Sequence, residues 1–512
     1  METHGRTTIY ACYTEKQLLS GTDEEIGNKV LDILNNSIKI HNQNKQESKY
    51  LKDYLYGIQD VKDKVKLTRT DINNKSVENW AYASMDWKKA FLLGKPIQYA
   101  PLNNIANDEI SQLNSYSEYE GKSSKDQDIY EDIFTVGRGF RYNVASEVSD
   151  EDEAPFDILN LDVLNTEVVY SNSIYHEQLL AFVETDMQYI VSEVNPNTGK
   201  PENRPVPYQE YTVYTKNKQY TINNKSGNLK IIDSQPRTLN THVVTEYYFN
   251  KERVSFLELV KDILNDLNDV ENMDKDDIEG FVNAIMVFTN AEVNKEGMDA
   301  IKEYGAVSIK STDQKKASVE LLQSRLKSLD TQIYYLRKLS ALHSILSIPQ
   351  ATQNGEISNA ETGKAVLTGQ GYTSASVRVQ NEENYFKECD RKALKVILKI
   401  CRSIDKSGIE NLKVKDIDIK FSRDLSDNLL TKTTALLNLA SAQIPPEIRN
   451  AVVNLFSDPL SVTRMQEAYM KEQREIQQEL ETRKIGTNNN ENKTNEIMNK
   501  VQDNVQNENQ GN

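Results

Sequence analysis

The chain has 512 residues, which is too long for one ordinary globular core and predicts about three or four structural units. Lysine and arginine total 61, and aspartate and glutamate total 77, so the net charge is −16. This balance excludes a protein that coats nucleic acid through a general basic surface, but not one that handles DNA without gripping it. Hydrophobic residues make up only 38% of the chain, yet its 26 tyrosines and 12 phenylalanines exclude a wholly disordered protein.

The cysteine content and the distribution of apolar residues indicate the cellular compartment in which the protein works. Cys12, Cys389 and Cys401 are too few for a disulfide framework and favour a reducing environment. The first 20 residues hold no apolar run of signal-peptide length, and apolar stretches such as 284–288 are far shorter than the ~20 residues that span a bilayer. The sequence therefore predicts a soluble protein, made and used in a cytoplasm, with no membrane partner.

Apolar periodicity predicts helices in the first part of the chain, over 22–56, from 73 to the Gly94-Lys95-Pro96 stop, and over 103–138. An extended segment is expected from Pro96. Residues 140–250 are rich in tyrosine, valine and threonine in short alternating runs, which predict an antiparallel sheet region. The predicted fold class is α+β, mainly α.

Helical patterns return after Ser255. An acidic amphipathic helix over 255–280 is followed by a strand or helix end at 282–288, and Ser318–Leu346 is the clearest long helix, about 40 Å in length. Further on we expect the elements of a mainly helical C-terminal part: a polar loop at 347–358, a helix over 359–403 bent at Gly369 and Gly371, a strand at 417–421, helices at 429–439, 446–455 and 461–483, and a disordered tail after 486.

The sequence lacks the motifs that are typical of catalysis and of metal or cofactor binding. Gly355 and Gly363-Lys364 have seven residues between the glycines, where a P-loop has four, and alanine follows the lysine. Gly137-Arg138-Gly139 is too short for a dinucleotide fingerprint, and Cys389 lacks a partner at catalytic spacing. The acidic cluster over 274–279 lacks the glycine of a calcium loop. The sequence predicts no enzyme, no cofactor and no metal.

Several segments become informative when their order is considered. NNKSVENWAYASMDWKKAFLLGKPIQY (73–99) leads a helix into the turn Leu92-Leu93-Gly94-Lys95-Pro96-Ile97. Others follow at 170–185 (YSNSIYHEQLLAFVET), 254–288, 318–344, 347–367 (SIPQATQNGEISNAETGKAVL), 419–430 (IKFSRDLSDNLL) and Ser457-Asp458-Pro459. In this order, over about residues 50–475, they resemble the portal proteins of tailed double-stranded DNA bacteriophages of the siphovirus type.

This resemblance implies a portal fold with named parts. They are a wing at 1–253 (helical over 22–138, antiparallel sheet region over 140–250), a first stem helix at 254–284, a small α/β clip at 285–317, a second stem helix at 318–346, a tunnel loop at 347–358, a long kinked helix and wing strand at 359–424, a helical crown at 425–486 and a disordered tail at 487–512.

The resemblance also implies a function and partners. Portal proteins form a ring, usually of twelve subunits, at one capsid vertex, through which DNA is packaged by a separate terminase and later ejected. The expected partners are further copies of the chain, double-stranded DNA, the terminase, the major capsid protein, a head–tail adaptor and a scaffold protein, with the clip docking the terminase and then the adaptor. The expected location is the virion, after assembly in the host bacterial cytoplasm.

Three groups of residues are candidates for this work. An acidic channel wall would repel DNA and let it slide, and its candidates are Glu258, Asp262, Asp266, Asp269, Glu271 and Asp277; an ordinary solvated helix is the alternative. Stem packing between subunits, or within an intramolecular hairpin core, would use Phe256, Leu259, Ile263, Leu322, Leu326, Leu329 and Ile333. Weak, reversible phosphate contacts in the tunnel loop would use Gln350, Thr352, Gln353, Asn354 and the flexible Gly355.

Two other classes of protein compete with this interpretation. Another capsid structural or scaffolding protein would lack either the sheet region or the two long helices that flank a small insertion. A DNA-packaging enzyme would need Walker or metal-carboxylate signatures, which the sequence does not contain.

Overall fold

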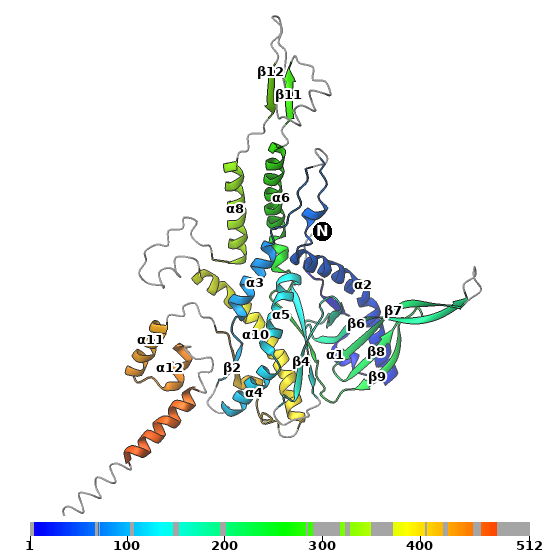
Figure 1. Cartoon of the computed structure of the whole chain (residues 1–512). Helices are drawn as coiled ribbons and strands as arrows, with labels where there is room; N and C mark the ends of the chain where they lie inside the picture. The colour runs from blue at the N-terminus through cyan, green and yellow to red at the C-terminus, as the bar shows by residue number, and fades with distance from the viewer. Residues whose placement is uncertain are drawn as a thin grey trace, which may run out of the picture. The chain divides into compact units, whose positions relative to one another are not determined.

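The computed structural model describes residues 5–66, 70, 72–102, 107–146, 153–194, 201–282, 285–289, 318–322, 328–349, 372–404, 407–422, 429–453 and 462–478. The chain divides into two compact units, Met1–Arg423 and Asp424–Asn512. The fold is mixed α and β, consistent with the predicted α+β class (Figure 1).

Helices dominate the first 136 residues, which also contain the two short strands β1 and β2. Thr22 begins the long helix α2 with a capping box, in which its side chain and that of Glu25 bond each other's backbone N–H groups. The helix expected from residue 73 begins only at Trp80, because Asn79 supplies its cap. The elements of this part are α1 (Glu15–Leu18), α2 (Asp23–Leu55), η1 (Asp60–Asp63), α3 (Trp80–Leu93), β2 (Gln98–Pro101), α4 (Asn107–Tyr119) and α5 (Lys122–Val136).

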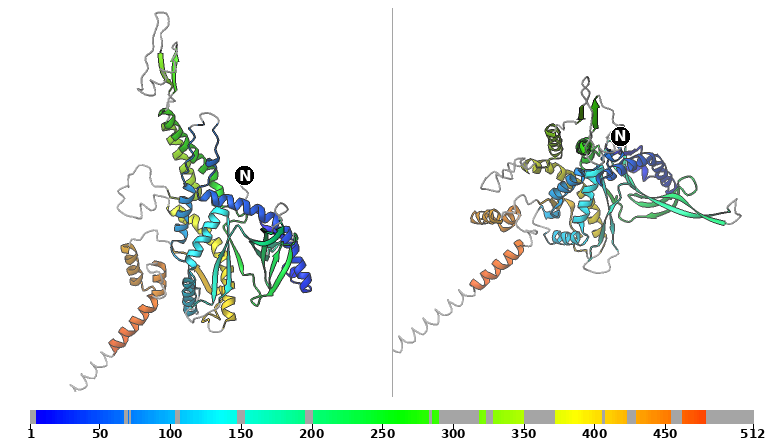
Figure 2. Two further views of the ribbon diagram at one scale, coloured as in Figure 1. Left: turned by 45° about the vertical axis from the view of Figure 1, so that its right-hand side comes forward. Right: turned by 45° about the horizontal axis from the view of Figure 1, so that its top comes forward.

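The sheet region is antiparallel, as predicted, but it is divided into two sheets. One has the strand order β10-β3-β4, and the other has the order β1-β5-β6-β7-β8-β9, with β1 parallel to β5. The two turned views separate the larger sheet from the helices around α5 (Figure 2). The strands are β1 (Ile9–Ala11), β3 (Arg138–Ala145), β4 (Phe156–Leu161), β5 (Thr166–Ser171), β6 (Gln178–Val194), β7 (Pro201–Thr215), β8 (Lys218–Asn223), β9 (Lys230–Pro236) and β10 (Val244–Tyr248).

The long helix predicted over Ser318–Leu346 is wrong at its beginning. Ser318–Leu322 form strand β12, which pairs antiparallel with β11 (Ile285–Thr289), and helix α8 runs only from Ser328 to Leu346. A short apolar run such as Val319–Leu322 fits both periods, and pairing with the β-branched and aromatic β11 favours the strand. Residues 318–322 therefore pair with the segment before the insertion and do not begin the second long helix.

The remaining elements agree closely with the helical and strand patterns of the sequence. Strand β13 pairs with β2, which joins two segments more than 300 residues apart. The bend expected at Gly369 and Gly371 lies outside the described residues, and so does the tail after residue 486. The elements are α6 (Phe256–Val282), α10 (Tyr372–Ser403), η2 (Val414–Asp416), β13 (Ile417–Lys420), α11 (Leu429–Ser441) and α12 (Pro446–Val453), with residues 462–478 also helical.

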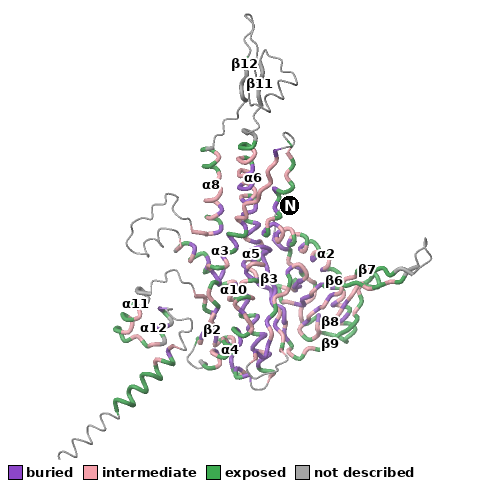
Figure 3. The backbone as a smooth tube through the Cα atoms, viewed as in Figure 1, coloured by how far each residue is buried: buried purple, intermediate pink, exposed green. Residues whose placement is uncertain are grey.

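A buried charge cluster holds the centre of the first unit together. Arg141 on β3 is fully buried, with Nη1 2.7 Å from Asp126 Oδ1 and 3.7 Å from Asp390 Oδ1. Lys122 Nζ lies 2.7 Å from Asp126 and 3.2 Å from Asp390. Two cations thus face two carboxylates. Burial acts to raise the pKa of Asp390, but Lys122 and Arg141 outweigh it, and the pKa is lowered. Figure 3 shows the buried backbone concentrated around these elements.

A second buried network joins α2 to the larger sheet. Glu167 on β5 accepts two hydrogen bonds of 2.7 Å from Arg138 and one of 2.9 Å from Asn44. His41 Nε2 lies 2.7 Å from a Glu184 carboxylate oxygen, and its other ring nitrogen lies 3.6 Å from Glu167. Burial alone would raise the pKa of Glu167, but Arg138, His41 and Asn44 lower it to about 2.

The turn between α5 and β3 requires glycine. Gly137 ends α5 in the left-handed region at φ 89°, and a Cβ there would lie 2.0 Å from the carbonyl oxygen of Arg253, just before α6. Gly137 therefore lets the backbone that precedes α6 approach α5 closely.

Gly137→Ala should destabilise the chain more than Gly227→Ala. Both glycines have φ 89°, so both variants incur the left-handed strain of about 1–2 kcal/mol, but nothing lies within 4 Å of a Cβ at Gly227. The midpoint of thermal unfolding measures the difference. Equal midpoints for the two variants would show that the contact with Arg253 does not matter.

Glu167→Gln should cost about 3–5 kcal/mol at neutral pH, because Arg138 is left buried without its carboxylate. The folded pKa of Glu167 lies below the ordinary 4.5, so its stabilisation is complete above pH 4.5 and is lost as the pH falls toward 2. The deficit of the variant, measured by thermal unfolding, should shrink over that range. The exposed Glu177→Gln is the matched control, expected to change stability by less than about 0.5 kcal/mol at all pH values.

Candidate functional site

Along the chain, α6 precedes strands β11 and β12 and α8 follows them. The two helices form an antiparallel pair, and Figure 1 shows them side by side. Lys338 on α8 donates to Asp266 on α6 over 2.5 Å. Lys88 contacts both helices where α8 ends and α6 begins. It donates to the Leu346 carbonyl and lies 4.2 Å from the Phe256 ring centroid. We call α6 and α8 the stem pair.

The N-terminus of α6 is capped and held by buried charge. Ser255 and Glu258 form reciprocal side chain to backbone hydrogen bonds of 3.0 and 2.8 Å, a capping box. Glu258 also pairs with Arg6, which is itself buried and lies 3.2 Å from Glu47 on α2. This arrangement ties the first residues of the chain, α2 and α6 together.

A row of polar side chains on α6 binds the extended segment 72–79. Asn272 accepts from the Ser76 N–H over 2.7 Å and donates to the Ser76 carbonyl over 2.8 Å. Asn268 accepts from the Glu78 N–H, and Asp276 accepts from the Asn74 N–H. We call Asn268, Asn272 and Asp276 the polar ladder. Its spacing of four residues places it on one face of α6, and this spacing is the signal in the sequence that indicates these residues.

The predicted acidic wall is divided by the structure. Glu258 is wrong as a wall residue, because it is only 7% exposed and is used in the N-terminal cap and the pair with Arg6. Asp266 and Asp269 are partly exposed and pair with Lys338 and Lys64, the latter over 2.7 Å.

Glu271 pairs with Lys275 over 3.0 Å on the helix surface. Asp262 and Asp277 are exposed, and within the described part of the chain neither has an ion pair. Among the six predicted wall residues, these two are therefore the exposed carboxylates that have no ion pair with a described residue.

The predicted stem-packing residues fall on different faces from those expected. The buried face of α6 is formed by Leu257, Val260, Leu264 and Leu267. Phe256 and Ile263 pack at the edge of this core, whereas Leu259 is 55% exposed, Leu329 67% and Ile333 48%. An intramolecular hairpin core is therefore wrong for these three exposed residues. Leu322 lies on β12 and not on a stem helix, and Leu326 lies outside the described residues.

The tunnel-loop candidates Gln350, Thr352, Gln353, Asn354 and Gly355 lie outside the described residues. Just before them, Ser347 has a positive φ of 60°, and its hydroxyl accepts from Arg378 on α10 over 2.8 Å. The end of α8 is therefore tied to α10 at the point where this loop begins.

The described residues also bear on metal binding, thiol chemistry and membrane insertion. They contain no group of three or more His, Cys, Asp or Glu arranged to hold a metal ion. Burial raises the pKa values of both Cys389 and Cys401 to about 12, which keeps these thiols protonated and unreactive. No helix among the same residues has the length and apolar character to cross a membrane.

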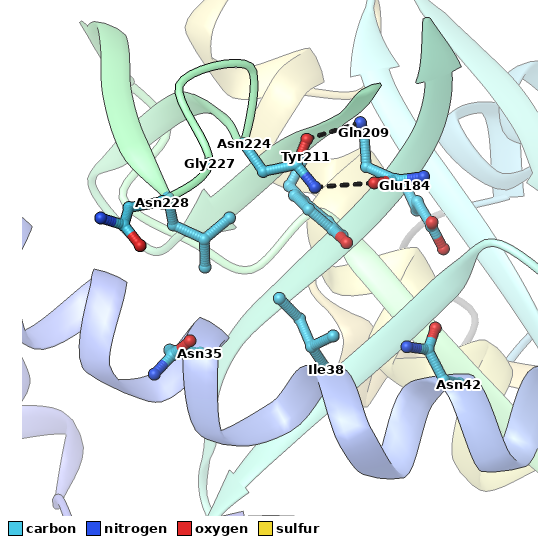
Figure 4. Close-up of a pocket in the computed structure, with 10 residues that line it drawn as sticks. Asn35, Ile38, Asn42, Glu184, Gln209, Tyr211, Asn224, Gly227 and Asn228 are labelled. Atoms are coloured by element: carbon cyan, nitrogen blue, oxygen red, sulfur yellow. Dashed lines mark hydrogen bonds between the residues drawn. The ribbon is translucent and has the colours of Figure 1, made fainter. Parts of the chain in front are cut away.

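A cavity lies among the described residues of each unit. In the first unit, a cavity of 380 Å³ lies between α2 and the larger sheet, where Gln209 and Asn224 hydrogen-bond each other, as Figure 4 shows. In the second unit, a 590 Å³ cavity lies between α12 and the helix at 462–478, lined by Arg449, Glu467, Lys471 and Arg474 among others. Neither cavity combines a nucleophile with a base at catalytic distance.

Comparison with known proteins places the chain in a family. Residues 34–484 match the model of the family described as phage portal protein, SPP1 Gp6-like. No curated protein matches the chain. Among solved structures, the chain is similar to one in the neck of an empty GTA particle computed with C6 symmetry, with 9% identity, a TM-score of 0.35, and coverage of 73% of this chain and 90% of that one.

The structural likeness is too distant to carry an argument, so the assignment rests on the family model. That model spans most of the chain, from within α2 to beyond the helix at 462–478, and includes the strands from β2 to β13 and the stem pair. The chain belongs to the SPP1 Gp6-like family of phage portal proteins.

Proposed function

We propose that this portal protein assembles into a ring, with twelve subunits expected, at one vertex of the capsid, and that viral DNA passes through its central channel during packaging and ejection. The match to the portal family over residues 34–484 carries this proposal. A terminase supplies the energy of packaging, and head–tail connector proteins attach to the ring once the DNA is inside. The major capsid protein, and a scaffold protein during assembly, surround it.

The parts of the chain have separate tasks in this proposal. The stem pair forms the wall of the channel, the β11–β12 clip docks the terminase and then the adaptor, and the loop at 347–358 forms the narrowest constriction. The N-terminal helices and both sheets form the wing, and the unit that begins at Asp424 forms the crown. The loop carries out its task through Gln350, Thr352, Gln353, Asn354 and Gly355, whose side chains contact phosphates weakly and release them.

The exposed acids of α6 repel DNA in this channel. Asp262 and Asp277 contribute most, because they have no cation to offset their charge among the described residues. Asp266, Asp269 and Glu271 contribute less, since each has a lysine partner. Repulsion prevents the counterion release that drives proteins onto DNA, so the polymer slides without a strongly bound state.

The exposed apolar residues of the stem pair make the contacts between subunits. Leu259, Leu329 and Ile333 are too exposed to stabilise the isolated chain. Burial of each side chain against a neighbour contributes roughly 1.5–3 kcal/mol, repeated at every interface of the ring.

Electron microscopy and mass measurement of the purified protein should reveal a ring with a central hole, and twelve chains of 58.5 kDa give about 700 kDa. Leu329→Glu combined with Ile333→Glu should shift the protein to smaller species at the same concentration, because charged groups cannot be buried unpaired at each interface.

The control for this variant is Tyr175→Glu, which changes a residue that is 80% exposed outside the stem pair and should leave the ring intact. Circular dichroism should show that all three proteins are equally folded. A stable monomer of the wild-type chain, or an unaffected ring in the double variant, would contradict the proposed assembly.

Asp262→Lys should increase the affinity of the ring for short linear double-stranded DNA by at least about tenfold at low salt, and the gain should fall steeply as salt rises. Filter binding between about 50 and 200 mM salt measures this. Asp233→Lys, which makes the same charge change at an exposed position on β9, is the matched control. Equal gains in the two variants would show that Asp262 does not face the DNA.

A further inference from the structure

Strands β6 and β7 continue well beyond the sheet to which they belong. Their pairing runs from Leu180–Thr215 to Val194–Pro201, whereas β5 accompanies β6 only as far as Val183 and β8 accompanies β7 only from Glu210. We call the two-stranded remainder, residues 185–194 and 201–209, the arm. Figure 1 shows it projecting beyond β8 and β9, and Figure 3 shows much of it exposed.

The direction of the backbone N–H groups along the arm follows from two hydrogen bonds at its base. The Glu184 N–H donates away from β7, to the Asn165 carbonyl over 2.7 Å. The Gln209 N–H donates away from β6, to Asn224 Oδ1 over 2.8 Å. Because N–H directions alternate along an antiparallel strand, even-numbered residues of β6 and odd-numbered residues of β7 face outward.

The outer edge of β7 in the arm is closed to another strand. Pro201, Pro205 and Pro207 all occupy outward-facing positions, opposite Val194, Ile190 and Gln188. Proline has no N–H to donate, and prolines on an edge strand are a common way to prevent edge-to-edge pairing.

The outer edge of β6 in the arm has no such protection. Its outward-facing residues all retain their N–H groups: Asp186, Gln188, Ile190, Ser192 and Val194. In the described part of the chain, no strand pairs with them. An isolated two-stranded ribbon is marginally stable in water, and Ile190 and Met187 are 69% and 40% exposed. One edge is therefore closed, and the other can receive a strand.

The charge of the arm indicates which strand would fit. Among residues 185–194 and 201–209, Asp186, Glu193 and Glu202 oppose the single cation Arg204. A second copy of the chain is a poor match, since its net charge is −16 and its own edge strand β9 contains one lysine and one aspartate, which gives it no net positive charge. A basic strand satisfies both the hydrogen bonds and the charge.

We propose that the outer edge of β6, from Asp186 to Val194, is a docking site for an extended, net-basic segment of another protein, which adds to the arm as a third strand. This site lies outside the proposed channel and does not depend on it. Main-chain hydrogen bonds supply the affinity, and the net negative charge of the arm's sequence favours a basic partner over an acidic one.

Binding can be tested on the full chain with a fluorescent ten-residue peptide in which lysine alternates with valine and threonine. The double variant Gln188→Pro and Ser192→Pro removes two outward N–H groups that the β6–β7 ladder does not use. Its matched control is Gln188→Ala with Ser192→Ala, which removes the same side chains and retains the N–H groups.

Fluorescence anisotropy should show at least tenfold weaker binding to the proline variant than to the wild type and the alanine variant. A peptide with glutamate in place of lysine should bind at least tenfold more weakly to the wild type. Equal binding to the proline variant, equal binding of the two peptides, or no binding of the basic peptide would each overturn the proposal.

Residue-resolved hydrogen exchange on the wild type tests the same edge without relying on variants. The even-numbered amides from Asp186 to Val194 should exchange quickly in the free protein and slow at least tenfold with the basic peptide, while odd-numbered amides in the ladder are protected in both states. Unchanged exchange would contradict the site. Protection that rises with protein concentration alone would identify a second copy as the occupant and overturn the choice of a basic foreign strand.

Discussion

The pairing of Arg6 with Glu258 is the contact on which the position of the stem depends. Both groups are almost inaccessible to water, so neither charge can be left alone without a large penalty. Arg6 also donates its backbone N–H to the Arg253 carbonyl over 3.2 Å, the same carbonyl that Gly137 approaches. The chain N-terminus, the end of α5 and the start of α6 thus converge at one point, where the direction of α6 is set.

Along the rest of α6, some polar side chains bind the backbone of segment 72–79, and others are exposed to solvent. The polar ladder satisfies backbone groups of segment 72–79, which has little regular secondary structure of its own. Asp276 belongs to this group. Burial acts to raise its pKa, but Lys66 and Asn74 outweigh that effect and lower it. A strongly acidic helix is therefore not uniformly an acidic surface. In the proposed channel, only those carboxylates that point away from segment 72–79 and from α8 would be free to repel DNA.

Sequence patterns located most helices and the antiparallel sheet region, because periodicity and turn residues report local geometry directly. They were less informative about Ser318–Leu322, where the pairing with Ile285–Thr289 depends on a residue separation that no local pattern records. The apolar stripe predicted on α6 included Leu259, which is exposed, and omitted Leu257, which is buried. Burial of Glu258 could not be foreseen either, since its partner Arg6 lies 252 residues away.

The distribution of thiols has a practical consequence for study of the assembly. Of the three cysteines, Cys389 and Cys401 are enclosed within the core around α10, and Cys12 is exposed beside strand β1. A maleimide dye added to the native protein should therefore attach to one position per subunit without any engineering. Counting photobleaching steps on single particles would then report directly how many subunits each assembly contains.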